Sequence, residues 1–435
     1  PLVPLEEKTE YAVVLTDRMK SANGAPVKSP FDGVHHPAQR RGAERLKEIL
    51  SDGKLASYYG DIAGTGLSHV AFTWTFTTQP TFEDMKVLRD GLYGKGPFAR
   101  WKDEFPPDAE AYPAGGISSD PNESPGWQTS RPACKERAKA PYVLKLQDPD
   151  IKGAFHDMLA DVFNLSPGEL KSTEEQFKWI DHVVIGTFKS PYLLGDPASR
   201  DENTRFHVSF LTGEGDVRSD TVSFFMVVPK ETATHKQPFP ISMLGHGVTG
   251  NASEALFYGG DYARQGIALV GVNMPEHGAT LSDGERLLAR SKLTETCLVP
   301  FLAAYEKGRA HDLNGDGKPD SGWFWWTTHI PHTRDNVRQG LLDTFQGVRV
   351  FRSFDGVRKS TQDYNGDGVP DLAGDFDGNG VPDVGGTKPF YTTGESLGSI
   401  MSDIQGGAEP QIIATASAGG GAGSLALDVA FRSYG

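Results

Sequence analysis

Strand-length apolar runs alternate with helical patterns from about residue 180 onwards, and this alternation constrains the fold more than any other feature of the sequence. Short apolar runs bounded by turn residues indicate buried strands, whereas apolar residues that recur every three or four positions indicate helices. Strands that alternate with helices form an α/β sheet with helices on its faces. We expect strands at 180–188, 206–210, 221–228, 240–244, 267–272, 388–393 and 411–416. We expect helices at 252–264, at 282–308 with a break at Pro300, and at 333–348.

The residues before this core carry a weaker pattern. Strands are expected at 10–17 and 70–78, and helices at 38–52, 80–95 and 151–178. The stretch 96–145 is rich in Pro, Gly, Ser and charge, so we expect a long loop that wraps another domain. The run YAVVLT, a following Asn-Gly turn and the later FTWTFTT resemble the later strands of a bacterial Ig-like domain with a helical insertion. Because an Ig sandwich needs about seven strands, we expect this region to be partial.

These patterns divide the chain into three parts. The fold class expected is α/β, with a core whose C-terminal part is incomplete and a smaller β-rich N-terminal region. The expected boundaries are 1–95 for the partial Ig-like region, 96–179 for the wrapping and helical segment, and 180–435 for the core, with an insertion at about 310–385.

Composition excludes several classes of partner. The net charge is −14, which argues against nucleic-acid binding because that function needs a basic face. No apolar stretch reaches the length of a transmembrane helix. The two cysteines, Cys134 and Cys297, either form a disulfide in an oxidising compartment or remain as two buried thiols.

A nucleophile motif follows the strand expected at 388–393. Gly394-Glu395-Ser396-Leu397-Gly398 matches G-x-S-x-G, and a helical spacing and a further strand come after it. Strand, tight turn and helix are the context that this motif requires, because the turn lifts the serine hydroxyl above the sheet edge. We therefore interpret Ser396 as a catalytic nucleophile; the alternative is a Gly-Ser turn without function.

A second glycine-rich loop follows the strand expected at 240–244. The loop runs Gly245-His246-Gly247-Val248-Thr249-Gly250. In a serine hydrolase of this type, one oxyanion donor is the N–H after the nucleophile and another comes from such a loop. The predicted donors are the backbone N–H groups of Leu397 and Val248, and we expect His246 to orient the loop rather than transfer protons. A plain glycine-rich turn is the alternative.

The resemblance of the chain follows from these stretches. FFMVVP…PISMLGHGVTG, GIALVGVNMPEHG, RDNVRQGLLD and PFYTTGESLGSIMSDI are similar to segments of large bacterial extracellular lipases and esterases of the α/β-hydrolase superfamily. The resemblance implies hydrolysis of carboxylic esters through an acyl-serine. It does not define the acyl chain.

The acid and base of a catalytic triad are missing after Ser396. The family order is Ser, then Asp or Glu, then His, yet all twelve histidines precede Ser396 and the last is His332. Of the later aspartates, Asp403 lies in the helix behind the motif and Asp428 lies one strand too early. Three explanations stay open: a second polypeptide supplies both groups, further residues of the same chain supply them, or the protein is a non-catalytic relative. We expect one of the first two.

Three Asp-rich segments share one pattern of oxygen-bearing side chains at positions 1, 3, 5 and 9 and glycine at position 6. With the carbonyl of position 7, such a loop suits Ca²⁺. The predicted ligands are Asp312, Asn314, Asp316, Lys318 and Asp320; Asp363, Asn365, Asp367, Val369 and Asp371; and Asp375, Asp377, Asn379, Val381 and Asp383. Position 12 is never Glu, so the loops depart from EF-hands and are closer to thrombospondin-type or dockerin-like loops. Solvated Asp-Gly turns are the alternative.

We expect these loops to clamp the insertion rather than take part in catalysis, since hard oxygen sites do not normally activate water near neutrality. Calcium loops favour a secreted protein or one at the outer surface of a bacterial cell. The expected substrate is an ester or a lipid. The competing functional hypothesis is a non-catalytic, calcium-stabilised surface or adhesion protein with a decayed hydrolase domain. The aromatic run at 322–326 either lines an acyl pocket or packs the insertion, and packing is favoured.

Overall fold

The computed structural model describes residues 5–41, 44–46, 69–80, 82–116, 130–199, 201 and 203–420. The chain divides into two compact units, Pro1–Asp84 and Met85–Gly435.

The first unit contains one antiparallel strand pair. β1 (Glu10–Thr16) pairs with β2 (Val70–Thr77), which confirms the two strands expected there, and the short 3₁₀ helix η1 (Pro37–Gln39) precedes β2. The helix expected at 38–52 falls partly outside the described residues. Because the described part of this unit holds only this strand pair, its Ig-like character stays a prediction.

The second unit is built on a mixed sheet of eight strands among the described residues. The strands lie in the order β10-β9-β7-β8-β6-β5-β3, and β4 also pairs with β5. Strands β7, β8, β9 and β10 are parallel to their neighbours within this group, whereas β6 is antiparallel to both β5 and β8. Their bounds are β3 Ala109–Ala111, β4 Leu144–Lys145, β5 Ile180–Tyr192, β6 Arg218–Pro229, β7 Ile241–Gly245, β8 Ala268–Val272, β9 Phe390–Glu395 and β10 Ile412–Ala418.

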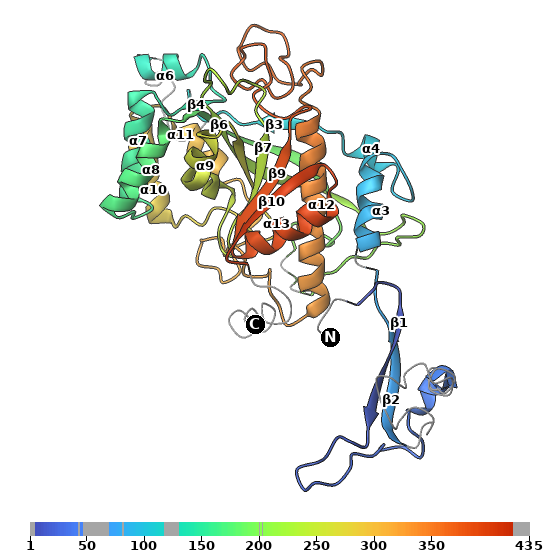
Figure 1. Ribbon diagram of the computed structural model, residues 1–435. Helices are drawn as coiled ribbons and strands as arrows, with labels where there is room; N and C mark the ends of the chain where they lie inside the picture. The colour runs from blue at the N-terminus through green and yellow to red at the C-terminus, as the bar shows by residue number, and fades with distance from the viewer. Residues whose placement is uncertain are drawn as a thin grey trace. The chain divides into compact units, whose positions relative to one another are not determined.

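Helices cover both faces of this sheet, so the unit belongs to the α/β class that the sequence predicts (Figure 1). Alternation along β6 divides its side chains between the faces: Phe225 and Val227 pack with helices α7 to α11, whereas Phe224 and Met226 pack with α12. The helices are α3 Phe82–Leu92, α4 Trp101–Glu104, α6 Pro132–Arg137, α7 Pro149–Asp161, α8 Pro167–Phe177, η4 Ala252–Glu254, α9 Ala255–Ala263, α10 Asp283–Thr294, α11 Val299–Tyr305, α12 Ile330–Arg352 and α13 Leu397–Ala408.

Three sequence expectations about elements are wrong. The strand expected at 206–210 is a loop with one isolated bridge, Val208 to Gly215. The stretch 96–145 is not only a wrapping loop, because β3 and β4 lie in it and pair with β5. The helical break lies between α10 and α11 rather than at Pro300, since a proline in the first turn of a helix removes no intrahelical hydrogen bond.

A disulfide joins Cys134 in α6 to Cys297 in the turn before α11. The bond fixes the end of the 96–145 stretch against the helical face of the sheet. Among the described residues, no helix combines the length and apolar character that crossing a membrane requires.

Candidate functional site

The predicted nucleophile lies at a strained turn between strand and helix. β9 ends at Glu395, α13 begins at Leu397, and Ser396 between them has φ 55° and ψ −118°. Residues other than glycine rarely adopt positive φ, and strain of this kind costs about 1–3 kcal/mol. Such a strained strand-to-helix turn is what the G-x-S-x-G motif needs to expose its hydroxyl. The Ser396 side chain is accordingly neither buried nor fully exposed.

Three glycines let the backbone pass closely enough to form this turn. A Cβ on Gly398 would lie 1.9 Å from the carbonyl oxygen of Gly245, and a Cβ on Gly394 would lie 2.2 Å from the Gly398 backbone. Distances this short are incompatible with any side chain. The first turn of α13 therefore packs directly on the ends of β7 and β9.

The same packing brings the two predicted oxyanion segments together. β7 and β9 are parallel, and Gly245 pairs with Gly394, so both strands end at one edge of the sheet. Val248 and Leu397 belong to one apolar cluster with Trp325. Among the described residues, no acceptor is found for the backbone N–H of Val248 or of Leu397. Both groups can therefore donate to an anion at this edge.

His246 positions the loop after β7. Its Nε2 accepts a hydrogen bond from the Met274 N–H at 3.1 Å, and its Nδ1 lies 2.9 Å from the carbonyl oxygen of Gly247. Burial lowers the pKa of His246 to about 4, so the ring is neutral, with the proton on Nδ1. Both nitrogens are thus used in holding the backbone.

Glu254 is a partly buried carboxyl beside the same loop that the sequence patterns did not single out. Its Oε2 accepts a hydrogen bond from the Gly247 N–H at 3.2 Å. The pKa of Glu254 is raised to about 7. Burial is the main cause, the charge of the nearby Glu395 adds to it, and the hydrogen bond from Gly247 opposes it. No motif marks this residue, because its role arises only where η4 meets the loop.

No general base is found beside Ser396 among the described residues. Its Oγ has no hydrogen-bond partner there. His277 is fully buried: its Nδ1 is bonded to the Pro275 carbonyl oxygen at 2.7 Å, and its Nε2 has no hydrogen-bond partner among the described residues. Both ring nitrogens of His332 are bonded to backbone oxygens, at 2.8 and 2.9 Å. Asp403 bonds to the Ser417 hydroxyl. Asp428 lies outside the described residues.

Comparison with known proteins yields only distant likeness. No family model and no curated protein matches the chain. Among solved structures, it is weakly similar to an acetyl xylan esterase from a Paenibacillus species, at 14% identity and a TM-score of 0.25 over 66% of this chain and 63% of that one. A mutant of the rice cell wall degrading esterase LipA from Xanthomonas oryzae gives 12% identity and a TM-score of 0.24 over 54% of this chain and 41% of that one.

Acetyl xylan esterase 1 from a Thermoanaerobacterium species gives 12% identity and a TM-score of 0.23, with 57% of each chain covered. The chain thus spans less than two thirds of the length of these structures. At such TM-scores, the matches do not establish an activity for this chain.

The first two predicted calcium loops share one pattern of hydrogen bonds. Asp312 and Asp363, at position 1, each accept from the N–H groups of the glycines at positions 4 and 6. Asp320 and Asp371, at position 9, each accept from the N–H at position 2. The two segments therefore fold alike, with the side-chain oxygens turned towards the backbone of their own loop.

The third loop keeps part of this pattern, and its first and last aspartates are buried. Asp375 accepts from the N–H groups of Asn379 and Gly380, and Asp383 accepts from that of Phe376. Burial raises the pKa of Asp375 to about 6, and the adjacent Asp383 and Asp377 also raise it. Carboxylate oxygens carry more acceptor sites than these bonds use, so the donor set suits a hard cation.

A histidine of the central sheet lies beside this third loop. His182 of β5 is fully buried, and its Nδ1 lies 2.8 Å from Asp181 Oδ2. Burial alone would lower the pKa of His182, but Asp383 and Asp181 raise it to about 10. No sequence pattern indicates this group, because the loop residues follow His182 by almost two hundred positions.

Proposed function

We propose that the chain carries the nucleophile and oxyanion donors of a serine hydrolase that cleaves carboxylic esters. Ser396 attacks the ester carbonyl, the alcohol leaves, and water releases the acyl group from the serine. The backbone N–H groups of Val248 and Leu397 stabilise the tetrahedral oxyanion. The strained conformation of Ser396, between β9 and α13, is the observation that carries this proposal.

The packing around the turn supports the same function. Gly245, Gly394 and Gly398 fix the nucleophile relative to the loop after β7 through backbone contacts alone. Two backbone N–H groups without an acceptor, at the same edge of the sheet as the serine, are what an acyl-transfer site needs. A glycine-serine turn without function would not need strain at the serine.

The acid and base of the triad then come from groups outside the described residues. A serine without a base is a weak nucleophile at neutral pH. The outer edge of β10 has no strand partner among the described residues, and an open edge can accept a further strand by backbone hydrogen bonding. A segment added at this edge, from a second polypeptide or the same gene product, would lie one strand away from β9, which leads into Ser396, and can bring a histidine to that serine.

A fluorophosphonate probe tests the nucleophile. Protein purified from its native source, with any associated chain, should be labelled at Ser396, and Ser396→Ala should lose both the label and hydrolysis of a p-nitrophenyl ester. Ser399→Ala is the matched control, since that serine is buried in the same helix. Labelling that persists in Ser396→Ala, or a folded native assembly that is never labelled, would refute the assignment and favour the non-catalytic alternative.

For the three Asp-rich loops, the proposal is structural calcium. The repeated hydrogen-bond pattern and the all-oxygen donor sets of the first two loops support it. When bound, Ca²⁺ neutralises the carboxylates that each loop brings together. Such sites fit a protein that works outside a bacterial cell, where free calcium is abundant.

A further inference from the structure

The third Asp-rich loop differs from the other two in one respect: a buried histidine faces it. His182 has no exposed surface, and no atom forms a hydrogen bond with its Nε2 among the described residues. That nitrogen forms an ion pair with Asp383 Oδ2, 3.4 Å away. This ion pair is longer than a good direct hydrogen bond, so the buried ring nitrogen is only weakly satisfied, and a group that binds both atoms would complete their contacts.

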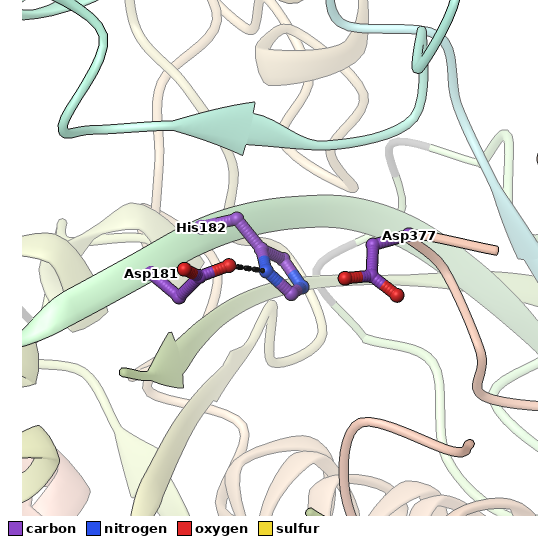
Figure 2. A group of neighbouring side chains, drawn as sticks. All are labelled: Asp181, His182 and Asp377. Atoms are coloured by element: carbon purple, nitrogen blue, oxygen red, sulfur yellow. Dashed lines mark hydrogen bonds and ion pairs between the residues drawn. The ribbon is translucent and has the colours of Figure 1, made fainter. Parts of the chain in front are cut away.

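Two carboxylates flank the imidazole on opposite sides. Figure 2 shows Asp181 bonded to one side of the ring and Asp377 facing the other. Ligand atoms of Asp181, His182 and Asp377 all lie within 4.8 Å of one another. Asp377 is only partly buried, so solvent and ions reach the site from its side.

The distances fit a tetrahedral centre with nitrogen and oxygen ligands. Zinc lies about 2.0–2.1 Å from His nitrogens and carboxylate oxygens. In a tetrahedron of that size, two ligand atoms are about 3.4 Å apart. The separation of His182 Nε2 and Asp383 Oδ2 is 3.4 Å. The two atoms can therefore bind one ion with little movement.

The surroundings also fit a zinc ligand set. A metal-bound histidine usually donates its other ring N–H to a carboxylate, and Asp181 is placed to accept it. Metal-bound carboxylates are themselves hydrogen-bonded, and Asp383 accepts from the Phe376 N–H at 3.1 Å and from Gln237 Nε2 at 2.6 Å.

We propose that His182, Asp377 and Asp383 bind one Zn²⁺ ion, with Asp181 orienting the imidazole and a water completing the shell. Calcium prefers oxygen ligands alone, whereas imidazole and carboxylate together suit zinc. The third loop therefore takes a different ion from the first two. This inference does not depend on ester hydrolysis, and it replaces calcium only at the third loop.

The test is zinc titration of the full chain, freed of metal and held in millimolar calcium, followed by calorimetry. We expect one tight zinc site per chain. Asp181→Asn should weaken zinc binding about 10–100-fold, as loss of an orienting carboxylate does, and His182→Asn should abolish the site. His156→Asn is the matched control, because His156 is bonded to Glu174 in a similar pair on the surface.

Cobalt provides a readout that needs no folded histidine variant. In the wild-type chain, bound Co²⁺ should give the visible absorption of a tetrahedral nitrogen and oxygen site, and zinc should displace it. Asp377→Asn, at a partly exposed position, should reduce that signal. The proposal is overturned if calcium-saturated protein binds no zinc, or if His182→Asn and His156→Asn bind zinc equally. In that case His182 is an imidazolium paired with its carboxylates.

Discussion

Gly398 shows how single atoms set the geometry of the candidate site. A Cβ at this position would meet the Gly245 carbonyl oxygen at 1.9 Å, and a backbone atom cannot move aside as a flexible side chain can. We expect Gly398→Ala to destabilise the second unit by about 3 kcal/mol or more. It should also abolish labelling of Ser396 in the native assembly.

Gly407, in the same helix, is the control for that substitution. A Cβ there would have no neighbour within 4 Å. Gly407→Ala should therefore leave stability unchanged or raise it by about 0.5–1 kcal/mol, because alanine is the better helix former. Thermal unfolding of both variants decides the matter. Equal midpoints for the two would mean that α13 does not pack on β7 as described.

Glu254 makes stability depend on pH. Its pKa is raised to about 7 in the folded protein, so between about pH 4.5 and 7 the folded state holds a proton that the unfolded state has lost. Stability should therefore fall as pH rises through this window and level off above it. Glu254→Gln keeps an acceptor for the Gly247 N–H but cannot ionise. In the variant, the slope of stability against pH should correspond to up to one fewer proton bound on folding. The variant should also be more stable than the wild type at pH 8.

Thermal midpoints measured from pH 5 to 8 test this expectation. Burial raises the pKa of Glu276 to about 7 as well, so part of the slope will remain in the variant. Glu175→Gln, at an exposed carboxyl of α8, should reproduce the wild-type profile. If Glu254→Gln does the same, the Glu254 carboxyl is not buried against the loop.

At the scale of elements, the Asp-rich loops form a cation-dependent part of the second unit. Each loop gathers three aspartates in nine residues, and their repulsion opposes folding unless a cation is bound. Removing bound cations with EDTA should lower the thermal midpoint, and calcium in excess should restore the part of the loss that comes from the first two loops. When the free calcium concentration is a hundred times the dissociation constant of a site, binding at that site adds about 2.7 kcal/mol to the free energy of unfolding.

Magnesium is the control for the calcium effect, because its smaller shell fits such loops poorly. We expect it to restore little of the lost midpoint. Asp363→Asn should reduce the calcium effect in the second loop, whereas Asp216→Asn, a charge at the surface outside the loops, should not. An EDTA midpoint identical to the calcium midpoint would identify the loops as solvated turns.

At the scale of the whole molecule, the disulfide closes the longest covalent loop. Cys134 and Cys297 are 163 residues apart, so the bond restricts much of the unfolded chain. Replacing both by alanine should destabilise the second unit by about 3–5 kcal/mol, if loop entropy dominates. Thermal unfolding of oxidised wild type and the double variant measures this. A loss below about 1 kcal/mol would indicate that the helical face alone holds the two segments.

Sequence patterns predicted the sheet better than they predicted the contacts on it. β5 to β8 carry apolar runs that local periodicity reveals, and β9 was found from the G-x-S-x-G motif that follows it. β3 and β4 are two or three residues long and depend on pairing with β5, which no local pattern encodes. The oxyanion loop and the serine were visible as motifs. Glu254 and His182 were not, because their surroundings come from segments far apart in the chain.

The glycines around the Ser396 turn also limit which substitutions the site can accept. Gly398 fills the space that a side chain on Gly245 or Gly394 would need, so substitution at one position is blocked by the others. Glu395, between two of them, is exposed. In a library randomised over residues 394–398 and selected for ester hydrolysis by the native assembly, survivors should keep both glycines and vary at the position between Gly394 and Ser396. New specificities would then arise by changing residues around an invariant backbone.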